Sequence, residues 1–399
     1  MRLKALLLGS ATALAVAGGA QAADLSVAEP VDYVRVCDAF GTGYWYVPGT
    51  DVCIKIWGLV RWEVDFYPGE DNFFQYQDGY PNDYNHWRFD TNLLFSVSAK
   101  SMTDWGPLEA YLDTWDWGWN EAWVSLGPLL AGYTQSLFNS WGPYALDDIP
   151  YGNWYQSEHR ADQIRLTWAM NGFGLAIGLE EPNYNNYPGV VPAGYAYYYP
   201  GYSGNGPYYY GYDSYSSMPD IVAALTFSNA SFDGKVSFVY SDYLTRVYDG
   251  YNSGRPAAWA VAAGVVIKLD SIAPGDALLL KAAYGTALPY IIGGGAGFNW
   301  DQDIWPGQAA WSVMASFKHY FAPNFYASIT GNYANAAQWW GPSGNRISSW
   351  QAEFDLSYSP APTLWITPGV RWISYTDSYV PSDSFTSWMA TIRIQKTLF

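Results

Sequence analysis

Beyond its first residues the chain lacks any long apolar run. A transmembrane helix needs about 20 consecutive apolar residues, and the densest candidate, Ala257 to Ile267, is too short. The sequence therefore offers no membrane-spanning helix. Charged residues are also scarce, at 14% of the chain, whereas hydrophobic residues make up 50% and aromatic residues 19%. This composition is unusual for a soluble enzyme, whose surface must be polar.

Basic residues and histidines are few as well. Lysine and arginine number 19 against 36 aspartates and glutamates, which gives a formal net charge of -17. So acidic a chain argues against nucleic acid as a partner. The histidines, His86, His159 and His319, fall in none of the patterns typical of serine hydrolases or zinc enzymes. We therefore predict that the chain is not an enzyme and has no catalytic residues, no metal site and no cofactor.

The first 22 residues have the features of a secretory signal. Arg2 and Lys4 give a basic end, Ala5 to Gly19 form an apolar stretch, and Ala20-Gln21-Ala22 fits a small-residue cleavage site. We predict a signal peptide over residues 1–22, and hence an exported protein.

Cysteine is nearly absent, with only Cys37 and Cys53. An exported protein meets an oxidising compartment, so we expect these two residues to form a disulfide. Metal binding by two thiols without a nearby histidine is much less favourable. The bond would tie an N-terminal periplasmic segment, residues 23–53, to the first strand, with a stabilisation of about 3 kcal/mol in the chain-entropy model.

A period of two dominates the rest of the sequence. Over residues 54–66 one parity is apolar, and the other carries Lys55, Arg61, Glu63 and Asp65. The pattern returns over residues 87–100. Strands of this length can span a bilayer, with one face toward outer-membrane lipid and the other toward water.

Weaker copies follow and bring the total to about sixteen strands, an even number as in bacterial single-chain barrels. They occupy residues 108–115, 121–126, 129–134, 163–170, 173–180, 221–227, 235–241, 259–269, 277–284, 311–318, 325–333, 350–358, 364–373 and 386–398. The connectors alternate short and long. We therefore predict an all-β fold, a 16-stranded antiparallel transmembrane β-barrel over residues 54–399, with short periplasmic turns and long extracellular loops. On composition alone, a soluble β-sandwich or propeller is the alternative.

A barrel of this strand number leaves an aqueous channel, so its selectivity depends on what narrows that channel. The third long connector, about residues 135–160, is the candidate constriction because it holds Asp147 and Asp148 among aromatic and proline residues that could anchor it. Inward parity on the opposing wall selects a set of arginines. They are Arg61, Arg371 and Arg393 on strands that closure makes neighbours, with Arg88, nearer the outer mouth, and Arg165 as possible extensions of the cluster.

Loop carboxylates opposite these arginines would create a transverse field that orders water and dipolar solutes and penalises apolar ones. Two other interpretations stay open. The arginines could simply pair with inward carboxylates, namely Glu63, Asp65, Asp90 and Asp113. Inward aromatic residues could stack on sugar rings, although such residues more often sit at the membrane interfaces or support a loop. They are Trp57, Tyr111, Trp115, Trp123 and Trp365.

One stretch resembles a known family. The run Val34-Arg35-Val36-Cys37-Asp38-Ala39-Phe40-Gly41 is followed by Gly43-Tyr44-Trp45-Tyr46-Val47-Pro48-Gly49-Thr50, by Cys53 and by Gly58-Leu59-Val60-Arg61. It resembles the opening signature of alphaproteobacterial porins of the rhizobial type. The resemblance implies a homotrimer of 16-stranded barrels in the outer membrane, each a passive channel for small hydrophilic solutes and ions, with the third loop folded into the lumen.

The C-terminus departs from the usual porin ending, in which apolar residues share the parity of the terminal phenylalanine. Here Arg393, Gln395 and Thr397 share the parity of Phe399. We therefore expect Phe399 to lie off the lipid-facing row, which puts in doubt its role as a signal to the outer-membrane assembly machinery. Two rival functions remain: a barrel enzyme such as a lipid hydrolase, and an adhesin whose tyrosine-rich loop, residues 183–217, binds a partner rather than only covering the pore mouth.

Overall fold

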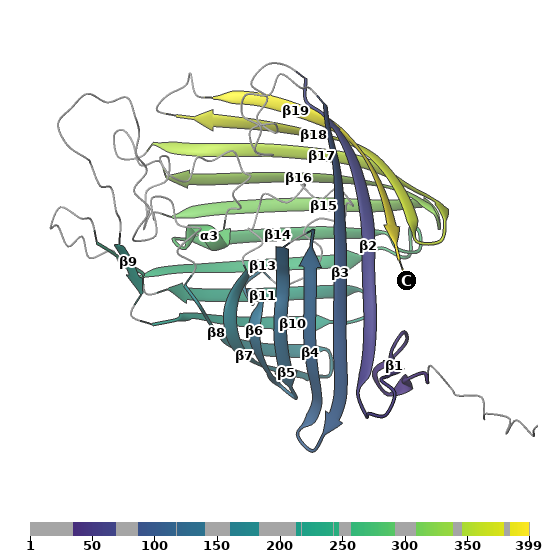
Figure 1. Ribbon diagram of the computed structural model, residues 1–399. Coiled ribbons are helices and arrows are strands. Elements are labelled where there is room, and N and C mark those ends of the chain that lie inside the picture. Colours follow the sequence, from purple (N-terminus) through teal and green to yellow (C-terminus); the bar gives the residue numbers. More distant parts are fainter. Residues whose placement is uncertain are drawn as a thin grey trace, which may run out of the picture.

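Strands that alternate polar and apolar residues close into a single barrel (Figure 1). The structure is a computed structural model. It describes residues 35–68, 87–116, 118–139, 160–182, 213–216, 218–241, 243–246, 257–291, 309–337, 345–378 and 384–398. Within these ranges, no helix is long and apolar enough to cross a membrane.

The elements follow one another along the chain with few exceptions to a simple up-and-down order. They are a 3-10 turn (Asp38–Phe40), β1 (Trp45–Tyr46), β2 (Cys53–Phe66), β3 (Trp87–Thr103), β4 (Gly106–Trp115), β5 (Gly118–Leu126), β6 (Leu129–Gln135), β7 (Arg160–Met170), β8 (Phe173–Glu180), β9 (Asp213–Ser216), β10 (Asp220–Ser228), β11 (Phe232–Ser241), β12 (Tyr243–Arg246), β13 (Ala258–Lys268), β14 (Ala277–Gly285), α3 (Leu288–Ile291), β15 (Ala310–Ala322), β16 (Phe325–Ala337), β17 (Arg346–Ala361), β18 (Leu364–Asp377) and β19 (Phe385–Thr397).

Sixteen of these strands form the closed wall, and every pairing in it is antiparallel. Each wall strand pairs with the next wall strand along the chain, so that β8 pairs with β10 and β11 with β13. The last strand, β19, pairs with the first, β2. The short β1 adds to the start of β2, while β9 and β12 form a separate two-stranded sheet. The predicted 16-stranded antiparallel barrel is confirmed, and each predicted strand overlaps one strand of the wall.

The two parities of a strand occupy different environments, as β17 illustrates. Outward residues are exposed apolar side chains, such as Phe354 at 42% exposure. The inward residues between them are polar and buried, such as Glu353 at 4% and Asp355 at 0%. Because a strand sends alternate side chains to opposite faces, this pattern places an apolar surface outside and a polar wall inside.

Short turns gather at the end of the barrel that also carries β1 and the C-terminus (Figure 1). Between β7 and β8 the turn is Asn171-Gly172, with φ of 51° and 81°. Positive φ at both positions is the geometry of the tight hairpin turn that Asn-Gly favours. This dipeptide therefore forms one of the short turns between neighbouring strands.

The expected alternation of short and long connectors is not strict. At the opposite end, β4 stops at Trp115 and β5 starts at Gly118, so this connection is as short as the periplasmic turns. Asp116 adopts a φ of 55°, and its carboxylate accepts hydrogen bonds from the Leu93 backbone N–H at 2.8 Å and from Asn92 at 3.1 Å. These bonds to the neighbouring strand hold Asp116 in a conformation that aspartate tolerates better than most residues, which allows a tight reversal.

Candidate pore-lining site

Three of the predicted arginines lie on adjacent strands of the inner wall. Arg371 is on β18, Arg393 on β19 and Arg61 on β2, and the pairings β18–β19 and β19–β2 bring them into one sector. Gln395 of β19 lies opposite Arg61, and Arg393 opposite Glu63. All three arginines occupy positions whose side chains face the inside of the barrel. The structure thus brings these three residues together on one side of the inner wall.

Two of the guanidinium groups are buried in ion pairs. Arg393 Nε donates to Glu63 Oε1 at 2.6 Å, and Arg371 Nε donates to Glu353 Oε2 at 3.2 Å. All four side chains are at most 4% exposed. Removing a charge from water is expensive unless an opposite charge and hydrogen bonds compensate. Each arginine is therefore held in place by its glutamate.

Arg61 and Arg88 have more open surroundings. Arg61 Nε donates to Gln395 Oε1 at 3.0 Å, and its guanidinium lies 4.8 Å from the Trp115 ring centroid. Arg88 lies at the outer end of β3, as expected, and pairs with Asp90 at 2.8 Å. The alternative that the arginines pair with inward carboxylates holds for Arg88 with Asp90 and for Arg393 with Glu63.

Arg165 belongs to another part of the wall. It lies on β7 between Leu130 of β6 and Gly178 of β8, five strands from β2 in the order of the barrel. The carboxylates that act most on its charge are Glu180 and Glu121. Arg165 therefore does not extend the cluster of Arg61, Arg371 and Arg393.

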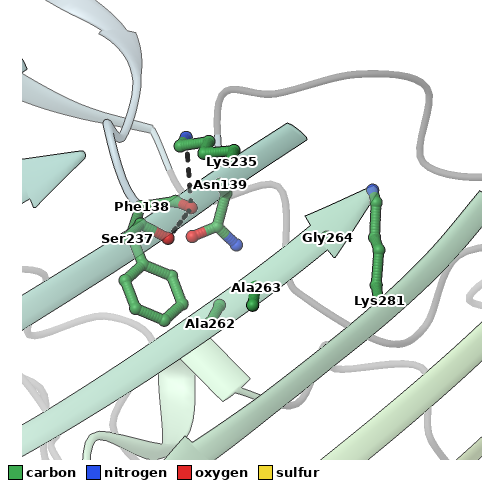
Figure 2. A pocket seen from close by; sticks show the side chains of 8 residues that line it. All are labelled: Phe138, Asn139, Lys235, Ser237, Ala262, Ala263, Gly264 and Lys281. Atoms are coloured by element: carbon green, nitrogen blue, oxygen red, sulfur yellow. Dashed lines mark hydrogen bonds between the residues drawn. The ribbon is translucent and has the colours of Figure 1, made fainter. Parts of the chain in front are cut away.

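The start of the connector 135–160 turns into the barrel and is fastened to its inner wall. Lys235 of β11 donates to the carbonyl oxygens of Leu137 and Phe138, and Ser237 Oγ donates to the Phe138 carbonyl at 2.9 Å (Figure 2). On β8, Glu180 Oε1 accepts from the Leu137 backbone N–H at 2.8 Å. β11 stands eight strands from β2 around a barrel of sixteen, so this anchor lies on the wall opposite Arg61. Asp147 and Asp148 lie outside the described residues.

An apolar cluster surrounds this anchor inside the barrel. The Phe138 ring lies 5.4 Å from the ring of Tyr290 in α3, and the Tyr290 hydroxyl donates to Asp220 at 2.8 Å. Ser312 Oγ donates to the Ile291 carbonyl at 2.9 Å. The wall beneath is lined by small inward residues, among them Ala258, Ala260, Ala262, Ala283, Ala310 and Ala334. The sequence did not predict that α3, which begins another long connector, lies inside the barrel.

The inward aromatic residues pack against other side chains of the wall. Tyr111 stacks on Trp123 across β4 and β5 with ring centroids 5.0 Å apart, and Trp365 lies 5.4 Å from Tyr326. The Trp115 ring lies beneath the Arg61 guanidinium. Trp57 shares their inward parity on β2.

The described part of the chain contains no group of three or more histidine, cysteine, aspartate or glutamate side chains placed to hold a metal ion. His319 lies near a periplasmic turn, where its Nδ1 is 2.7 Å from Asp276 Oδ2. His86 and His159 fall outside the described residues.

The predicted disulfide between Cys37 and Cys53 is present.

Comparisons with known proteins agree with this architecture. A family model described as "Porin subfamily" matches residues 24–396. Porin Omp2b of Brucella melitensis is 32% identical over 284 residues, which cover 63% of this chain and 70% of that protein. The outer membrane channel DcaP of Acinetobacter baumannii has a similar fold, with a TM-score of 0.63, 12% identity and coverage of 88% of this chain and 99% of that one. A trimer form of OmpT from Vibrio cholerae has a TM-score of 0.51, 9% identity, and coverage of 87% and 100%.

Proposed function

Because the chain belongs to the porin subfamily, whose model spans residues 24–396, we propose how its channel selects solutes. As a porin, it is a multi-pass protein of the outer membrane that forms a channel through which solutes pass. We propose that small hydrophilic solutes and ions diffuse passively between two unlike walls. One carries Arg61, Arg371 and Arg393, and the other is the inward-folded connector 135–160 with Asp147 and Asp148.

The observation that carries the proposal is the position of the loop anchor. Leu137 and Phe138 are fixed to β11, the strand half a turn of the barrel away from Arg61 on β2. The connector therefore begins on the wall opposite the arginine sector. Charges of opposite sign on facing walls give a field across the passage, which favours water and dipolar solutes.

The arginine sector itself supports a role beyond pairing with glutamates. Arg393 Nη2 is buried, and among the described residues it has no hydrogen-bond partner. A buried guanidinium N–H without a partner is costly, so water, a solute oxygen or a loop carboxylate would satisfy it. On the same side, Arg61 donates through Nε to the uncharged Gln395.

The test is ion selectivity in a planar bilayer. In the Asp147→Asn/Asp148→Asn variant, the preference for cations over anions should fall, because two negative charges leave the passage. The reversal potential in a salt gradient measures this preference. Asp104→Asn, in the turn between β3 and β4, removes a carboxylate outside the lumen and serves as control. An unchanged reversal potential in the double variant would remove the proposed constriction.

We also propose that the chain assembles as a homotrimer and that residues 1–22 are removed as a signal peptide. The trimer is suggested by the trimer form of OmpT, which shares the barrel fold. Cross-linking of the folded protein in detergent should give a band three times the mass of the monomer, and the purified protein should begin at Ala23. A monomeric protein in detergent would contradict the trimer.

A further inference from the structure

The N-terminal segment before the first barrel strand folds back onto the periplasmic end of the barrel (Figure 1). β1 pairs with the start of β2, with Trp45 opposite Ile54 and Tyr46 opposite Cys53. The backbone N–H of Cys37 donates to the Tyr44 carbonyl at 2.9 Å, and the disulfide joins Cys37 to Cys53. The segment is thus closed on itself and fixed to the wall at one end.

Its side chains form a small core that holds the segment in a defined shape. Cys37, Cys53 and Tyr44 are buried, and Phe40 and Tyr46 pack against them. The Phe40 and Tyr44 rings lie 6.2 Å apart. A covalent closure combined with a buried apolar cluster gives a rigid loop rather than a loose tail.

Tyr44 enters the lumen. Its hydroxyl lies 2.8 Å from Ser98 Oγ on β3, and both groups are buried. Ser98 has the same inward parity as Asn92 and Ser96 on that strand. Because Ser98 Oγ donates to Glu109 Oε1 at 2.6 Å, its single proton is used there, so the Tyr44 hydroxyl is the donor to Ser98.

Two ammonium groups flank the inserted ring. Lys100 Nζ lies 5.3 Å and Lys55 Nζ 5.8 Å from the Tyr44 ring centroid, and Lys100 pairs with Glu109 at 3.2 Å. An ammonium group within about 6 Å of an aromatic ring centroid is attracted to the face of the ring. The ring is therefore held between inward residues of β2 and β3, and Glu109 of β4 fixes the two β3 residues.

We propose that the segment from Cys37 to Cys53 is a fixed partial cover of the periplasmic mouth, and that Tyr44 is a size-determining residue of the channel at that end. This proposal rests on the proposed function as a diffusion channel. It places a second narrowing on the sector β2–β4, below the constriction formed by the connector 135–160. The solutes it affects are the larger hydrophilic ones, because a rigid ring in the passage excludes by size.

The experiment measures polymer exclusion from each side of the membrane separately. Polyethylene glycols of graded size are added to one compartment of a planar bilayer, and the largest polymer that still enters and lowers the conductance is recorded. In Tyr44→Ala, larger polymers should enter from the periplasmic side, with a rise in single-channel conductance, while the cut-off from the outer side stays the same. Val36→Ala is the control, since that side chain adjoins the same segment but is 63% exposed.

A second measurement avoids variants that fail to fold. Wild-type channels already inserted in the bilayer are treated with dithiothreitol, and thiol labelling confirms that the Cys37–Cys53 bond is open. A larger periplasmic cut-off after reduction supports the proposal. An unchanged cut-off in the reduced channel, or in Tyr44→Ala, overturns it and leaves the segment a structural staple. Absence of any conductance in the wild type would instead contradict the proposed function.

Discussion

The buried ion pair between Arg393 and Glu63 should be one of the most sensitive points of the barrel. In Glu63→Gln, the guanidinium would keep its charge at a site where it is only 4% exposed. Breaking such a pair from one side typically costs about 3–5 kcal/mol, because the remaining charge is buried without its hydrogen-bonded partner. We therefore expect the free energy of unfolding to fall by that amount.

The double variant Glu63→Gln/Arg393→Met separates the charge from the packing. It removes both charged groups and keeps an elongated side chain, so it should be more stable than Glu63→Gln alone. We expect a coupling energy of about 1–3 kcal/mol between the two positions. Urea unfolding of the detergent-folded barrel, followed by tryptophan fluorescence and by the gel shift between folded and unfolded forms, measures both values.

Asp233→Asn is the control, because its partner Lys268 and the aspartate itself are 32% and 33% exposed. An exposed pair of this kind contributes at most about 1 kcal/mol. If Glu63→Gln costs no more than Asp233→Asn, then solvent reaches the Arg393 pair freely, and the reasoning from burial is refuted.

Two glycines give further predictions. Gly178→Val would place a Cβ 3.0 Å from Leu137 Cδ1. It should therefore displace the anchored start of the connector and change the single-channel conductance. Gly331→Val is the control and should leave the conductance unchanged, because its Cβ would meet its nearest atom at 3.9 Å. Gly172→Ala, at φ 81°, should destabilise the barrel by more than about 1 kcal/mol in the same urea assay, whereas Gly118→Ala should cost less. Equal effects within either pair would contradict these steric arguments.

The strands could be predicted from the sequence because their signal is local. In the first strand the alternation of Val60, Trp62 and Val64 with Arg61, Glu63 and Asp65 is visible within a few residues, and a closed barrel needs nothing more to assign inside and outside. An even strand number then makes the first and last strands antiparallel neighbours, which places Arg61 beside Arg393.

Partners on different strands were harder to predict. Glu353, which pairs with Arg371, was missed although it lies with Gln351 and Asp355 on the inward parity of its strand. That parity was the available signal, but the pairing also depends on the register between β17 and β18, where Glu353 stands opposite Arg371. Register follows from the whole sheet and is not visible in one segment.

The inward fold of the connectors depends on contacts that are still more distant in sequence. Lys235 bonds to carbonyls of residues almost a hundred positions earlier, and Tyr290 bonds to Asp220 seventy positions earlier. No local pattern encodes such contacts. The short helix Leu288–Ile291 was accordingly assigned to an extracellular loop, whereas the residues described there contact the inner wall.

The inner wall has two halves with different side chains, and this asymmetry explains where the connector is anchored. From β13 to β16 the inward residues near the anchor are mostly alanines, such as Ala260 and Ala283, which leave room for Phe138 and Tyr290 to approach the backbone. From β17 to β3 they are long and charged, as in Glu353, Arg371 and Arg393, and these residues are already paired. An apolar segment buries itself at lower cost against the first half, since covering the second would take its charged groups further from water. The charged half therefore stays available to face the solutes that cross the channel.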